Sequence, residues 1–82
     1  MIYPDQIKAA RALVGFNQTE LAERSGVGIA TVKRIESSAQ IRGTAESFMR
    51  IQNTLEDAGV EFIPHGDGKG RGVRHKTQLS QQ

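Results

Sequence analysis

The sequence contains no cysteine, so neither a disulfide nor a thiolate-bound metal can stabilise the folded chain. It has no apolar run near the ~20 residues that a transmembrane helix requires, and its first residues lack the apolar core of a signal peptide. No residue pattern recurs at a fixed period, which excludes a repeat array. We therefore expect a cytoplasmic protein that makes no use of a membrane.

The sequence also has little excess charge of either sign. Eleven Lys and Arg residues oppose nine Asp and Glu residues, which gives a net charge of +2. Nucleic-acid binding would then depend on where the cations lie rather than on the total. A chain of 82 residues with 37% hydrophobic content forms one small domain that buries only about 60% of its unfolded surface. Because such a small core provides little surplus stability, we expect a second subunit to contribute, and therefore a homodimer.

Two stretches have the apolar spacing of longer helices. Pro4 suits a first helical turn and Gly15 a helix end, which predicts a helix over residues 4–14. Thr44 can cap another helix, and Gly59 can end it. The residues expected to be buried are Ile7, Ala10, Leu13 and Val14 in the first helix, Phe16 beneath it, and Phe48, Ile51, Leu55, Ala58 and the core filler Met49 in the other.

Between these helices, residues 17–36 predict two short helices joined by a glycine turn. Asn17 can cap the first of them, and Glu20, three residues on, can reach back to the N–H of the cap. That helix can run no further than about Ser25. Gly26 follows at the point where a chain leaving a helix adopts positive φ, a conformation that glycine adopts without steric cost.

The second short helix, over about residues 28–37, divides into two faces. At about 100° per residue, small or β-branched residues share one side, which suits burial. The other side carries two cations and no acid. This outward face comprises Ile29, Ala30, Lys33, Arg34 and Ser37, on an arc of roughly 140°.

Such a face suits the major groove of DNA, which admits one α-helix and offers guanine acceptors and thymine methyl groups. Two helices joined by a short glycine-containing turn form a helix-turn-helix. The same features also fit an ordinary helical hairpin whose charged face is merely solvated.

A set of residues at fixed spacing marks this stretch: Gln18, Leu21, Ala22, Gly26, Val27, Val32, Arg34, Ile35 and Glu36. Their pattern resembles that of the Cro and phage-repressor (XRE) family. In that family an alanine lies where the two helices cross, a glycine lies at the turn, and Val or Ile lies on the buried side of the recognition helix. Gly28 departs from the pattern, because the family often has a capping Ser or Thr there.

The resemblance also implies roles for two arginines. In the family, an arginine at the position of Arg11 often pairs with the glutamate that closes the recognition helix, here Glu36. This implies a structural clamp between the first and third helices, and the alternative for Arg11 is a direct phosphate contact. Family members often touch the sugar-phosphate backbone from the following loop, which here contains Arg42. A freely solvated Arg42 is the alternative.

After Gly59 the period changes from helical to extended. Residues 60–64 predict a short strand, and residues 73–76 could form a second, with a flexible glycine-rich turn between them. The expected fold is mainly α: a four-helix, phage-repressor-like helix-turn-helix domain with a short C-terminal β-hairpin or strand pair. We expect the helix-turn-helix domain over residues 1–64, the turn and second strand over 65–76 as part of that domain or of a dimer interface, and a disordered tail over 77–82.

Three other possible sites were weighed in the C-terminal region. Residues 66–70 resemble a phosphate-binding loop but lack the following Ser or Thr and the following helix. His65, Asp67 and His75 make a weak metal site on a glycine loop, and we expect no metal, no cofactor and no catalytic constellation. Four cations could follow a DNA backbone or keep an edge strand from aggregating. They are Lys69, Arg71, Arg74 and Lys76.

The function expected is that of a sequence-specific DNA-binding transcriptional regulator, a repressor that binds a pseudo-palindromic operator as a homodimer. Arg34 would read guanine, Lys33 a second guanine or a phosphate, and Ile29 and Ala30 thymine methyl groups. The alternative is a protein-binding module of the same fold, an antiactivator or antitoxin. The DNA backbone contacts expected are Gln18, Thr31, Ser37 and Arg42.

Overall fold

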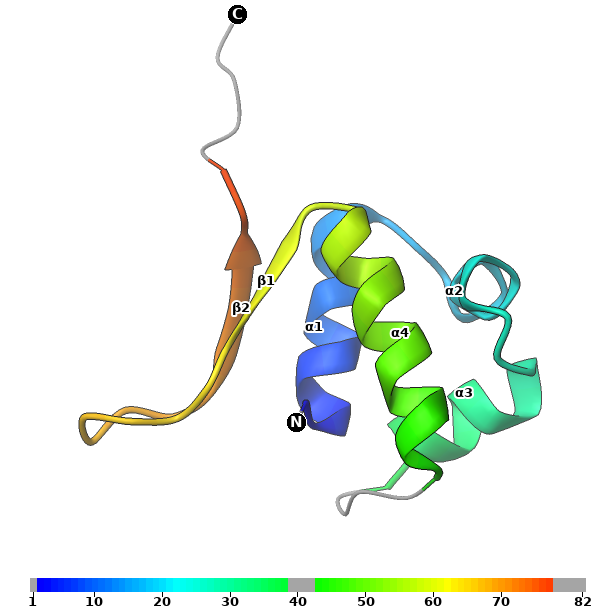
Figure 1. Cartoon of the computed structure of the whole chain (residues 1–82), viewed down its shortest axis with the longest axis horizontal. Helices are drawn as coiled ribbons and strands as arrows, with labels where there is room; N and C mark the ends of the chain where they lie inside the picture. Colours follow the sequence, from blue (N-terminus) through cyan, green and yellow to red (C-terminus); the bar gives the residue numbers. More distant parts are fainter. Residues whose placement is uncertain (1, 39–42, 78–82) are drawn as a thin grey trace, which may run out of the picture.

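The computed structural model describes residues 2–38 and 43–77 of the chain. In this part, four helices are followed by a two-stranded antiparallel sheet, which confirms the predicted fold class (Figure 1). Arg42 and all of the predicted tail beyond residue 77 lie outside the described residues. The elements are α1 (Pro4–Val14), α2 (Gln18–Ser25), α3 (Ile29–Glu36), α4 (Ala45–Asp57), β1 (Val60–Ile63) and β2 (Gly72–His75).

The helix ends follow local chemistry. Asn17 Oδ1 accepts a hydrogen bond of 2.7 Å from the backbone N–H of Glu20, which caps α2. The Glu20 carboxylate does not return to the cap, as a capping box would require; it pairs with Arg24 one turn later instead. Gly15 and Gly26, which end α1 and α2, both have φ of 75°, in the left-handed region that favours glycine.

The helices surround one apolar core. Its fully buried large side chains come from all four helices and from the first strand, and Phe16 packs against the core at its edge. Two predictions for α4 were wrong: Met49 is 62% exposed, and Ala58 is exposed at the C-cap. A core this small takes only the narrow stripe of α4 that contains Phe48, Ile51 and Leu55. In α1, Leu13 is only half-buried.

The two strands pair within the chain and pack against α1 and α4, with Phe62 opposite Val73. The second strand begins at Gly72 and ends at His75, one residue earlier than predicted. Asp67 and Gly68 have φ of 53° and 74°, and the backbones of the residues on either side of them are paired. These are the features of a two-residue type I′ turn, which defines the type of the turn that the sequence predicted between the strands.

Polar contacts fasten the hairpin to the start of α1. The amide nitrogen of buried Gln6 donates to the backbone oxygens of Ile63, at 3.2 Å, and Gly72, at 3.0 Å, so one side chain holds both strands. Arg71 reaches Asp5 through two hydrogen bonds of 3.0 Å. Within the described ranges, no helix has both the length and the apolar character needed to span a membrane.

Candidate nucleic-acid interface

A tight turn sets the angle between α2 and α3. Val27 is buried in this turn, and its backbone N–H donates to the hydroxyl of Ser25, which in turn donates to the backbone oxygen of Ala22. A Cβ at Gly26 would lie 3.1 Å from the Arg50 guanidinium, on a backbone whose φ is positive. The positive φ therefore favours glycine at this position, and any larger residue would also have to displace the end of the Arg50 side chain.

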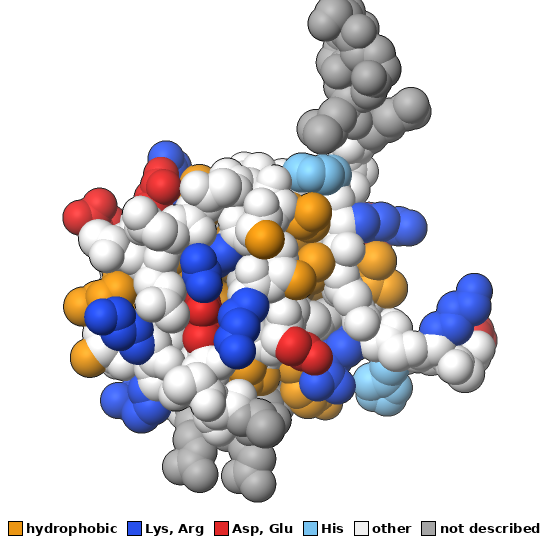
Figure 2. Space-filling model, turned by 180° about the vertical axis from the view of Figure 1, so that it is seen from behind, with side chains coloured by type: hydrophobic (Ala, Val, Ile, Leu, Met, Phe, Trp, Pro, Cys, Tyr) orange, Lys and Arg blue, Asp and Glu red, His pale blue; other side chains and the backbone are white. Residues whose placement is uncertain are grey.

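The two faces of α3 differ as the helical period predicts. Val32, Ile35 and Glu36 are buried against the other helices. The side chains predicted to read bases all lie on the opposite face: Ile29, which is 38% exposed, and the exposed residues Ala30, Lys33 and Arg34. Figure 2 shows Lys and Arg side chains at the end of the molecule where α2 and α3 lie, with hydrophobic side chains beside them.

Arg11 and Glu36 form the ion pair that the resemblance implies. Arg11 Nε and Nη2 each donate to a different Glu36 carboxylate oxygen at 2.8 Å, and Arg11 Nη1 donates to the backbone oxygen of Phe16. The Glu36 carboxylate, which is only 3% exposed, raises the pKa of Arg11 above its ordinary value. Because three of its N–H donors are bound within the protein, Arg11 is better placed to join α1 to α3 than to contact phosphate.

Gln18 belongs to the same network. Its side-chain nitrogen donates to Glu36 Oε1 at 3.1 Å, an interaction that sequence reasoning did not anticipate. An amide nitrogen carries two hydrogens, so one donor of Gln18 is left for a phosphate. The contact to Glu36 therefore orients the side chain at the start of α2, where the helix N-terminus favours an anion.

The other predicted backbone residues differ in how accessible they are. Thr31 is half-buried and lines a cleft with the start of α4. Ser37 is exposed, but its hydroxyl donates to the backbone oxygen of Arg34 at 3.0 Å, so a phosphate contact would require this hydroxyl to rotate. Arg42 lies outside the described part of the chain.

The arginines of the described part separate into two groups. Five of them have a carboxylate partner within the chain, at 2.8 to 3.0 Å: Arg11 with Glu36, Arg24 with Glu20, Arg50 with Glu46, Arg71 with Asp5, and Arg74 with Glu61. Over residues 2–38 and 43–77, Arg34 is the arginine that has none, and Lys33 beside it has none either. The exposed face of α3 thus presents cations that no acid in the described part of the chain neutralises.

The hairpin arginines are used differently. Arg71 also lies 4.0 Å from the centre of the Tyr3 ring, and Arg74 pairs across the strands with Glu61, its partner in the register. Each arginine lowers the pKa of its carboxylate partner, Asp5 or Glu61, chiefly by donating hydrogen bonds to it. Both side chains therefore fasten the hairpin. This role differs from the two that the sequence suggested for these cations, which were to follow a DNA backbone or to keep an edge strand from aggregating.

The glycine-rich tip does not assemble a metal site. Among residues 2–38 and 43–77, no three His, Asp or Glu side chains come close enough together to hold a metal ion. The tip of the hairpin contains residues 66–69, and its backbone closes on itself through the bonds between Gly66 and Lys69.

The glycine turn, the buried side of α3 and its exposed cationic side together define a helix-turn-helix. The helix-turn-helix family model matches residues 7–55, and the chain belongs to this family. It is a DNA-binding regulator of the XRE type. Comparison with curated proteins gives no match.

Proposed function

We propose that this protein is a sequence-specific transcriptional repressor that binds a pseudo-palindromic operator as a homodimer, with α3 in the major groove. The observation that carries the proposal is the unpaired Arg34 on the exposed face of α3, beside Lys33. An arginine without an internal partner keeps its planar fork of donors for guanine O6 and N7. A bound domain that overlaps a promoter excludes polymerase without needing any further surface, which is why we propose repression.

The remaining roles follow from position. Lys33 contacts a second guanine or a phosphate, and Ile29 and Ala30 pack on thymine methyl groups because neither side chain can form a hydrogen bond. Gln18 donates its second amide hydrogen to a phosphate and so fixes the register of α3 on the duplex. The protein acts on bacterial or phage-type DNA in the cytoplasm.

The experiment that tests the proposal is a selection of bound duplexes from random-sequence DNA by the purified chain. A homodimer predicts two inverted half-sites about one helical turn apart, ~34 Å. A single unrepeated half-site would contradict dimeric binding, and the absence of any enriched sequence would contradict sequence-specific binding.

A second function, a protein-binding module that acts on another regulator, is supported by two exposed apolar side chains. Ile29 is 38% exposed on α3, and Met49 is 62% exposed on α4. If this second function is correct, the purified unmodified chain should not bind DNA. The substitutions Ile29→Ser and Met49→Ser should then abolish regulation in cells. A gel shift with DNA flanking the gene separates the two functions.

A further inference from the structure

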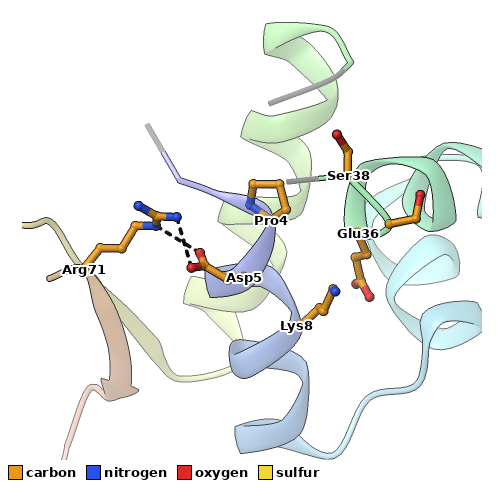
Figure 3. Close-up of a pocket in the computed structure, with 7 residues that line it drawn as sticks. Pro4, Asp5, Lys8, Glu36, Ser38 and Arg71 are labelled. Atoms are coloured by element: carbon orange, nitrogen blue, oxygen red, sulfur yellow. Dashed lines mark hydrogen bonds and ion pairs between the residues drawn. The ribbon is translucent and has the colours of Figure 1, made fainter. Parts of the chain in front are cut away.

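A cleft of about 380 Å³ is lined by residues from the start of α1, the end of α3 and the hairpin. Figure 3 shows α1 between the other two, with Arg71 reaching Asp5 on one side and Lys8 extending toward Glu36 on the other. Lys8 and Asp5 line it from α1, Glu36 and Ser37 from the end of α3, and Arg71 from the hairpin. The proposed function gives none of these residues a contact with DNA. The lining of the cleft therefore includes residues outside the recognition helix.

The charges of the cleft cancel in pairs except for one. Glu36 is neutralised by Arg11, and Asp5 by Arg71, each through two hydrogen bonds. Lys8 is exposed and has no ion-pair partner among the residues that the structure describes. Figure 3 shows its side chain extending into the space between α1 and the end of α3. The cleft thus has one uncompensated positive charge.

Lys8 lies close to the end of α3, on the same side of α1 as Arg11. Lys8 lies three residues before Arg11 on α1, and so on the same side of that helix. Both Lys8 and Gln18 border Glu36, the last residue of α3: Gln18 by a hydrogen bond and Lys8 across the cleft. A duplex that holds α3 in its major groove has a phosphate backbone passing along each side of the helix. Lys8 lines the cleft at the end of α3, on the side of Glu36.

We propose that this cleft seats a phosphate of the DNA backbone, with the Lys8 ammonium as its cationic ligand. The inference rests on the proposed function and adds a contact from α1 to it. Ser37, at the edge of the cleft, would contribute its hydroxyl to the same phosphate. A lysine that binds phosphate adds affinity for every sequence and releases counterions, so its contribution appears in the salt dependence of binding.

The test compares Lys8→Gln with Lys76→Gln. Lys76 is also exposed and unpaired among the described residues, but it follows β2, away from the cleft, so the two variants remove the same charge from different places. Affinity for the selected duplex is measured as a function of KCl concentration. Lys8→Gln should weaken binding to all sequences and reduce the slope of log K against log salt by about 1. Lys8→Arg should keep the slope.

Equal slopes for Lys8→Gln and Lys76→Gln would overturn the proposal. If Arg34→Ala still relaxed base preference in that case, the proposed function would stand without the Lys8 contact. Failure of the unmodified chain to bind any duplex would overturn both. Neither lysine has an ion-pair partner to lose among residues 2–38 and 43–77, so both variants should fold, and equal unfolding midpoints in urea check this.

Discussion

The recognition helix and the C-terminal hairpin use arginine in opposite ways. On α3, Arg34 lies on an exposed face and has no carboxylate partner among the residues that the structure describes. In the hairpin, Arg71 and Arg74 each form two hydrogen bonds with a carboxylate. An arginine already bound to a carboxylate has committed two of its five N–H donors and has its charge neutralised, which leaves less for a base or a phosphate. The comparison shows that the location of unpaired cations, rather than their number, distinguishes a binding face from a structural one.

The largest effect is expected at Glu36, a buried carboxylate that is paired with an arginine. Glu36→Ala removes a carboxylate that is 3% exposed and leaves Arg11 and Gln18 without their shared acceptor. Breaking such a pair should lower the free energy of unfolding by about 3 kcal/mol, as measured by urea denaturation. Arg50→Ala is the control, because its exposed pair with Glu46 should contribute no more than about 0.5 kcal/mol. Equal losses for the two variants would contradict a structural role for Glu36.

A smaller loss is expected at the junction of α1 and the hairpin. Gln6→Ala removes the amide that holds the backbone oxygens of Ile63 and Gly72. We expect unfolding to become easier by about 2 kcal/mol, because these oxygens lose their donor at a buried site. Hydrogen exchange should show faster exchange in the amides of the hairpin than in those of α2 and α3. Uniform acceleration throughout the chain would show that the hairpin is not fastened as a separate unit.

Gln18 has both a structural role and a proposed DNA-binding role, because it donates a hydrogen bond to Glu36 and is proposed to bind phosphate. Gln18→Ala should cost about 1 kcal/mol of stability, the contribution of one hydrogen bond. Its DNA affinity should fall by a similar factor for every sequence, and the base preference should stay the same. A change in the preferred bases would show that Gln18 reads sequence.

The smallest effect concerns the acid sensitivity of the hairpin pairs. The pKa values of Asp5 and Glu61 are lowered in the folded chain, so their stabilising contribution is present above the unfolded pKa values, about 4. It is lost as the pH falls through the folded values. The double variant Asp5→Asn, Glu61→Gln should therefore melt slightly below the unmodified chain at pH 7 and together with it in strong acid. A difference that persists at low pH would exclude these pairs as its cause.

The sequence predicted the helical part of the fold well, because that part follows local rules. The glycines at positions 15 and 26 and the cap at Asn17 fix helix ends through short-range chemistry. Met49 was misassigned because helical periodicity does not say how wide a core is. The Asp67–Gly68 pair did contain a signal for a type I′ turn, which could have defined the type of the predicted turn.

The candidate site was only partly predictable. The exposed face of α3 follows from its period, but the contacts of Gln6, Gln18 and Arg71 join residues far apart in the sequence. No spacing rule predicts that Arg71, separated by 66 residues from Asp5, will pair with it. The pairs that neutralise cations determine which ones are left for DNA, and those pairs come from the tertiary structure.

The most direct test of the central claim is the base preference of Arg34→Ala, measured by selection from random DNA beside the unmodified chain. We predict that the variant keeps its fold and its half-site spacing but loses discrimination at one base pair in each half-site, by about 1–3 kcal/mol. An unchanged preference at every position would mean that the unpaired arginine on α3 does not read the sequence, and would contradict the claim.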